Sequence, residues 1–135
     1  MAEATSGGRP RPLSPHVMHW RWHVTMAASI LNRVSGGACY VGLFLVAGWA
    51  LALASGEQAY ETYMGLLGSL PGKVVLFGFT VATFFHLAAG VRHLVWDMGR
   101  GYEKSIASTT AWLAFVFAIV ASVAVWVVAG VTGAL

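Results

Sequence analysis

The chain has 135 residues, of which 58% are hydrophobic and only 10% are charged. A soluble domain usually has about a quarter of its residues charged, so this composition argues against a water-exposed globule and predicts a single-domain membrane protein. The one cysteine, Cys39, excludes an intrachain disulfide and a cysteine-ligated metal cluster. The formal net charge is +3, but the basic residues are scattered among apolar segments, so no nucleic-acid partner is expected.

Residues 1–26 are predicted to form an N-terminal cytoplasmic segment. The segment is polar, and its three prolines disfavour helix formation: Pro10, Pro12 and Pro15. A secretory signal needs an apolar stretch, and none begins before Ala27. The prolines also interrupt the amphipathic helix that a mitochondrial transit peptide requires. We therefore expect an uncleaved tail.

Three long apolar segments are predicted to be transmembrane helices, over residues 27–55, 71–98 and 108–132. Within the first, the 23 residues from 34 to 56 have no charge. They give roughly 34 Å of helix, enough to cross the hydrocarbon core. Pro71 favours a helix start, because a proline in the first turn sacrifices no hydrogen bond. The expected fold class is therefore an all-α membrane protein with three transmembrane helices and an N-terminal cytoplasmic segment.

Two connections join these helices. Residues 56–70 are predicted to form an outer loop with a short interfacial helix, because four apolar or aromatic residues recur there at helical spacing: Tyr60, Tyr63, Met64 and Leu67. Residues 99–107 are predicted to form a cytoplasmic loop, since Gly99 and Gly101 end the second helix. Three helices make a thin bundle, so we expect it to pack with helices of a partner.

The basic residues predict the orientation of the chain. Seven of the eight Lys and Arg residues lie in or beside the N-terminal segment and the loop 99–107, and only Lys73 lies on the other side. By the positive-inside rule the N-terminus is cytoplasmic and the C-terminus is outside. The cytoplasmic interface then holds four tryptophans: Trp20, Trp22, Trp96 and Trp112. We expect a bacterial inner membrane, with a periplasmic C-terminus, rather than a mitochondrial inner membrane.

His86 is the ionisable residue that lies deepest in a predicted span. It precedes Asp97 by eleven residues, which is roughly 16 Å along a helix. Ionisable groups inside a membrane are costly and indicate function. One interpretation is an axial haem ligand, with Gly90 at i+4 leaving room for the flat macrocycle. The other is a structural histidine that hydrogen-bonds to a neighbouring helix.

His93 and Asp97 follow His86 at i+7 and i+11, so they lie on the same helix face, and Arg92 is expected beside them. This group suits a cationic cluster that meets haem propionates or a quinone head group. The alternative is an arginine that extends to the membrane surface, next to an Asp–His contact.

Ser29 and Arg33 form an i, i+4 pair at the start of the first span, with Asn32 beside them and Gly36 one turn further on. A guanidinium gives charge-assisted hydrogen bonds and a hydroxyl can reorient, so the pair can bind a quinone carbonyl. The alternative is an arginine that anchors the helix start at lipid phosphate.

Three blocks of sequence together resemble one family: RPLSPH at 11–16, SILNRVSG at 29–36 and HxxxGxRHLxWD at 86–97. The chain resembles the large cytochrome b anchor subunit of succinate dehydrogenase, respiratory complex II, over nearly its whole length. The resemblance implies that His86 is an axial ligand of a haem b shared with a second, smaller anchor subunit, which supplies the other histidine. It also implies that Ser29, Arg33 and Asp97 belong to the ubiquinone site, beside the iron–sulfur subunit.

The resemblance further places Arg33, Asn32 and His93 near the haem propionates. Asn32 departs from the family pattern, since many relatives have histidine there, and an amide cannot carry a charge. Trp20 likewise stands where tyrosine is commoner.

The implied role is to anchor the flavoprotein and iron–sulfur subunits in the lipid membrane and to pass electrons from succinate to ubiquinone. The chain itself would not oxidise succinate. Two other functions stay open: a fumarate reductase anchor that uses menaquinone, and a structural or transport bundle without a cofactor. The third span has no ionisable residue, which disfavours a transport path.

Overall fold

The computed structural model describes residues 21–133. Over these residues the chain forms four helices and no strand: α1 (Val24–Ala54), α2 (Glu57–Gly68), α3 (Leu70–Asp97) and α4 (Lys104–Val131). The predicted all-α fold class is confirmed. The block 11–16 and Trp20 lie outside the described residues, as does most of the N-terminal segment.

Three of these helices, α1, α3 and α4, are long and apolar enough to cross a membrane. Each ends one residue before the carboxyl end of the segment predicted from the sequence, and each begins earlier than predicted, by one residue at Leu70 and by three or four at Val24 and Lys104. An apolar stretch marks only the part of a helix that can lie in the hydrocarbon core of the membrane. The helix itself continues to its N-terminal cap residue. For α1 that cap is His23, whose backbone is extended (φ −138°, ψ 151°).

The short helix α2 connects α1 to α3 and is hydrogen-bonded to α1. The Tyr63 hydroxyl donates a hydrogen bond to the Leu45 carbonyl oxygen at 2.8 Å. Gly56, with φ of 106°, makes the turn from α1 into α2, a conformation that favours glycine. Ser69 then caps α3 by accepting the Gly72 N–H at 3.2 Å, with Pro71 in the first turn.

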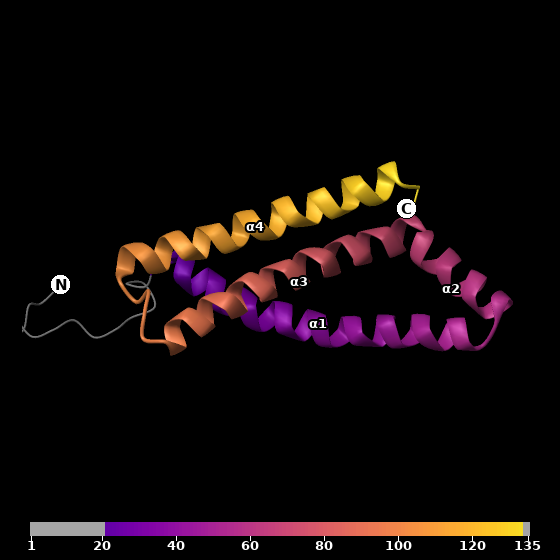
Figure 1. Ribbon diagram of the computed structural model, residues 1–135, viewed down its shortest axis with the longest axis horizontal. Coiled ribbons are helices and arrows are strands. Elements are labelled where there is room, and N and C mark those ends of the chain that lie inside the picture. Colours follow the sequence, from indigo (N-terminus) through magenta and orange to yellow (C-terminus); the bar gives the residue numbers. More distant parts are fainter. Residues whose placement is uncertain (1–20, 134–135) are drawn as a thin grey trace, which may run out of the picture.

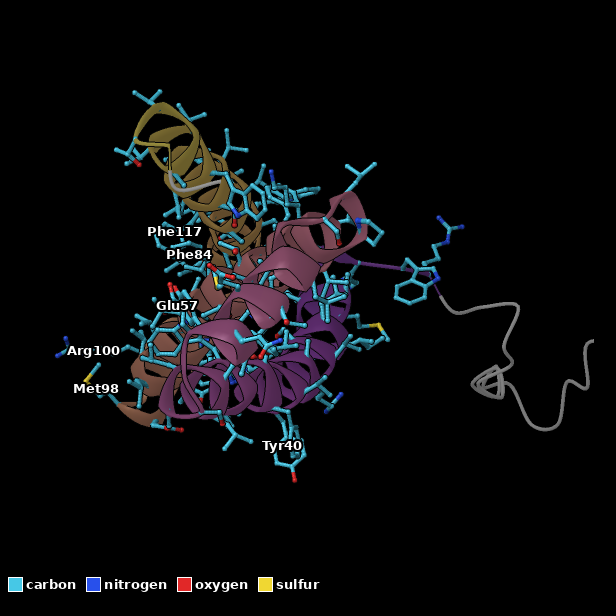
Figure 2. The ribbon with its side chains drawn as sticks, turned by 90° about the vertical axis from the view of Figure 1, so that its right-hand side faces the viewer. Tyr40, Glu57, Phe84, Met98, Arg100 and Phe117 are labelled. Carbon is cyan, nitrogen blue, oxygen red and sulfur yellow. The ribbon has the colours of Figure 1, made fainter. Side chains whose placement is uncertain are left out.

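The helix α3 lies between α1 and α4, and α2 closes one end of the molecule (Figure 1). At the other end the first turns of α1 pass α3 and reach α4 (Figure 1). The buried core is small and mostly alanine: Ala28, Phe85, Ala89, Ala111, Ala114 and Ala118. Small residues let apolar helices approach closely, which is how helices associate in lipid. Phe84 and Phe117 add an edge-to-face contact between α3 and α4, with ring centroids 5.9 Å apart (Figure 2).

Most large apolar side chains point away from the bundle. Tyr40, on α1, is 65% exposed and projects from the helices (Figure 2). A surface of this kind cannot face water over three long helices, so lipid or other helices must cover it. The chain is a multi-pass membrane protein.

Candidate functional site

The candidate site lies where the amino-terminal half of α1 meets the carboxyl-terminal half of α3. His86, on α3, is partly buried and turns its ring toward α1. Its Nδ1 lies 3.2 Å from the carbonyl oxygen of Asn32 and 3.3 Å from the hydroxyl of Ser35. The Ser35 hydroxyl in turn donates to the same Asn32 carbonyl at 3.0 Å.

Two glycines decide how much space surrounds the His86 ring. A Cβ at Gly36 would lie 3.0 Å from the ring carbon Cε1, so the absence of a side chain there lets the ring pack against α1. Gly36 was expected only to extend the face of Ser29, and its contact with His86 emerges from the structure. A Cβ at Gly90, one turn further along α3, would meet no other group within 4 Å. Within the described part of the chain, open space therefore lies on the surface of α3 one turn beyond His86.

Asn32 and His93 form a second contact between the same two helices. The amide Nδ2 of Asn32 lies 3.1 Å from Nε2 of His93. The amide Oδ1 is buried and has no hydrogen-bond partner within the described residues. Whichever way the amide is turned, only one of its two polar atoms faces His93, and the other requires a partner from outside this part of the chain. His93 also packs edge-on against Trp96, with ring centroids 5.2 Å apart.

The remaining predicted site residues do not join this network. Ser29 is half-buried, and Arg33 and Asp97 are exposed. Within residues 21–133 the structure gives none of these three side chains a hydrogen bond or an ion pair. The structure thus brings Asn32, His86 and His93 together, and Ser29, Arg33 and Asp97 do not join them within residues 21–133.

Arg92 does not extend the helix face of His93 as expected, although its guanidinium and the His93 ring both contact Trp96. Its side chain is only 8% exposed and is directed at α4. Nε donates to the Thr110 hydroxyl at 3.1 Å, Nη2 donates to the Ala107 carbonyl at 3.0 Å, and the guanidinium lies 4.0 Å from the centre of the Trp96 ring. Neighbouring residues on a helix point about 100° apart, so Arg92 and His93 face different helices.

Ser35 is the site residue that the sequence did not single out. It was part of the block 29–36, yet a serine inside an apolar helix gives no signal of its own. The available signal was its spacing, since Ser35 follows Asn32 by three residues and shares its helix face.

These features define a class of protein: a multi-pass helical membrane protein with a histidine-centred polar site between two spanning helices. Within residues 21–133 no three His, Cys, Asp or Glu side chains come together as a metal site. Residues 8–125 match the family described as the succinate dehydrogenase/fumarate reductase transmembrane subunit. The chain belongs to this family.

Individual relatives are named as succinate dehydrogenase cytochrome b subunits. The chain is 31% identical to the cytochrome b556 subunit of Rickettsia felis over 117 residues, which cover 87% of this chain and 91% of the relative. It is 35% identical to the cytochrome b556 subunit of Paracoccus denitrificans over 103 residues, 76% of this chain and 78% of the relative. It is 37% identical to the mitochondrial cytochrome b560 subunit of Sus scrofa over 99 residues, 70% of this chain and 57% of the relative.

Proposed function

We propose that the chain is the membrane-anchor cytochrome b subunit of a succinate:ubiquinone oxidoreductase. The observation that carries this proposal is His86: a histidine in a spanning helix, held through one ring nitrogen, with open space beside it at Gly90. The names of the relatives support the same role, since each is called a succinate dehydrogenase cytochrome b subunit.

The residues of this site fit a haem b. His86 would supply one nitrogen ligand to the haem iron, and a histidine of the smaller anchor subunit would supply another. Gly90 leaves room for the face of the macrocycle. The unpartnered amide atom of Asn32, together with His93 and Arg33, suits contacts with the propionates. When bound, the haem supplies a one-electron redox centre inside the membrane.

Ser29, Arg33 and Asp97 form the part of the quinone site that this chain provides. The guanidinium of Arg33 and the hydroxyl of Ser29 donate hydrogen bonds to a quinone carbonyl oxygen, and neither donor is engaged elsewhere among the described residues. Ubiquinone takes two electrons, delivered by the iron–sulfur subunit, and two protons from water on the cytoplasmic side to become ubiquinol. Asp97, at the exposed end of α3, is placed to pass those protons.

The partners follow from this role. The flavoprotein subunit oxidises succinate, the iron–sulfur subunit carries the electrons, and both dock at the cytoplasmic ends of α1 and α3. The second anchor subunit covers the apolar outer face of the helices, and lipid covers the rest. We place the N-terminus in the cytoplasm and the C-terminus in the periplasm of a bacterial inner membrane.

The test is the reduced-minus-oxidised optical spectrum of the purified complex. His86→Ala should abolish the b-type signal. His23→Ala, which changes a histidine at the start of α1, is the control and should leave the signal intact. An unchanged spectrum in His86→Ala would refute ligation by this residue.

The family description includes fumarate reductases, so an anchor that uses menaquinone is the second candidate. Extraction of the quinone that copurifies with the complex distinguishes the two. A structural or transport bundle without a cofactor predicts a colourless protein that does not copurify with a flavoprotein.

A further inference from the structure

We infer that Ser35 and the backbone carbonyl of Asn32 hold His86 in the tautomer with the proton on Nδ1, so that Nε2 is the atom presented to the haem iron. Ser35 is then a positioning residue of the haem site. The inference rests on the proposed function in one respect, which is that His86 binds haem. The tautomer itself follows from the contacts between α1 and α3.

The Asn32 carbonyl decides which nitrogen carries the proton. A carbonyl oxygen can only accept hydrogen bonds, and it lies 3.2 Å from His86 Nδ1. An unprotonated Nδ1 would point its lone pair at the lone pairs of this oxygen. The contact is therefore attractive only when Nδ1 is protonated, and a neutral imidazole then has its lone pair on Nε2.

The Ser35 hydroxyl provides a second acceptor for the Nδ1 proton of His86. Its single hydroxyl proton is directed to the Asn32 carbonyl, 3.0 Å away, so its oxygen lone pairs remain to accept a hydrogen bond. His86 Nδ1 lies 3.3 Å from that oxygen. The Nδ1 proton is thus shared between two acceptors, a carbonyl and a hydroxyl. Ser35 is only 5% exposed, so within this bundle the hydroxyl is shielded from competing solvent.

Gly36 sets the position of the ring. Because a Cβ there would lie 3.0 Å from His86 Cε1, the imidazole packs directly on the α1 backbone. The ring is therefore held at Nδ1 by two acceptors and at Cε1 by the helix surface. Within the described residues Nε2 has no hydrogen-bond partner, which leaves its lone pair free.

The hydrogen bonds at Nδ1 affect the redox potential of an iron bound at Nε2. A hydrogen bond from Nδ1–H makes an imidazole a stronger electron donor through Nε2 and fixes the ring orientation. Loss of one acceptor weakens that donation and favours the ferrous state, so the midpoint potential of the haem rises. It also frees the ring to turn about its own axis, which changes the low-spin ferric EPR signal.

The experiment compares Ser35→Ala with Ser122→Ala in the assembled complex. Ser122 is also buried, and its hydroxyl donates to the Ala118 carbonyl of its own helix rather than bonding His86. We expect Ser35→Ala to retain haem with a higher midpoint potential and a shifted low-field EPR g value. Ser122→Ala should match the unmodified complex in both readouts. A potential and a g value in Ser35→Ala equal to those of Ser122→Ala would overturn the inference.

A second pair of variants covers the case in which Ser35→Ala does not assemble. Gly36→Ala places a methyl group against the His86 ring, whereas Gly37→Ala places one where nothing lies within 4 Å. We expect the haem content per complex to fall several-fold in Gly36→Ala and to stay unchanged in Gly37→Ala. Equal haem content and equal EPR signals in the two variants would contradict the proposed position of the ring.

His86→Ala distinguishes a failure of the proposed haem ligation from a failure of the positioning role of Ser35. If His86→Ala retains the b-type signal, the ligation proposal fails, whatever the serine variants show. If His86→Ala loses the signal while Ser35→Ala behaves like Ser122→Ala, only the positioning role of Ser35 fails.

Discussion

Asn32 on α1 contacts α3 in two ways: its side-chain amide lies 3.1 Å from His93 Nε2, and its backbone carbonyl lies 3.2 Å from His86 Nδ1. One residue thus contacts both histidines of α3. The two contacts differ in how they respond to mutation, because a substitution removes the amide and leaves the carbonyl in place. The contributions of His86 and His93 can therefore be separated at a single position.

Asn32→Ala should retain haem, because the carbonyl that accepts from His86 belongs to the backbone and only the amide assigned to the propionates is lost. Loss of the amide removes the hydrogen bond to His93, worth about 0.5–1.5 kcal/mol. The thermal midpoint of the purified complex should fall slightly. Haem content is measured from the reduced-minus-oxidised spectrum, normalised to protein. A complex that lacks haem in Asn32→Ala would show that the side chain, rather than the carbonyl, holds the His86 site.

Gly90→Ala tests whether a macrocycle lies beside His86. Within the described residues a methyl group at Gly90 meets nothing within 4 Å, and the same is true at Gly78 on the same helix. Packing in this chain alone therefore predicts no cost for either variant, and alanine favours a helix by about 1 kcal/mol over glycine. If haem occupies the space at Gly90, Gly90→Ala should lower haem content several-fold and Gly78→Ala should not. Equal haem content in both variants would remove Gly90 from the haem site.

Much of the fold was predictable because hydrophobic length and charge are properties of the sequence itself. The three apolar segments predicted the spanning helices, and the recurrence of Tyr60 and Tyr63 predicted the short helix that the structure shows as α2. Helix starts were less predictable. Val24 and Lys104 lie outside the apolar stretches, and their helical state depends on hydrogen bonds that continue to a cap.

The site was predictable residue by residue but not in its contacts. Asn32, His86 and His93 were identified, and the structure brings them together. Arg92 was assigned to the wrong neighbours, because spacing fixes the direction of a side chain on its own helix but not which helix lies there. Its partner Thr110 belongs to α4, whose placement depends on packing among alanines. The role of Ser35 depends on a backbone carbonyl, which no sequence pattern displays.

Arg33→Leu should impair quinone reduction without impairing succinate oxidation. Hydrogen bonds from a charged donor are worth roughly 1.5–3 kcal/mol, so ubiquinone reductase activity should fall about 10- to 100-fold. Oxidation of succinate with an artificial soluble acceptor should persist, because the proposed function assigns that step to the flavoprotein subunit. Arg100→Leu is the control, since this exposed arginine on the α3–α4 connection points away from the helices (Figure 2). If Arg33→Leu retains full activity with ubiquinone, the quinone assignment of Arg33 is wrong.

Thr110→Val should destabilise the contact between α3 and α4 while sparing the haem. The buried Arg92 guanidinium would lose the acceptor at Nε, 3.1 Å away, and keep only the Ala107 carbonyl and the Trp96 ring. An unsatisfied buried donor costs about 1–3 kcal/mol, more when it is charged. Thr109→Val is a matched control, because that exposed hydroxyl bonds only the Ser105 carbonyl of its own helix. The thermal midpoint should fall in Thr110→Val and not in Thr109→Val, with the haem spectrum unchanged in both. Equal midpoints would mean that Arg92 does not depend on Thr110 to hold α4 against α3.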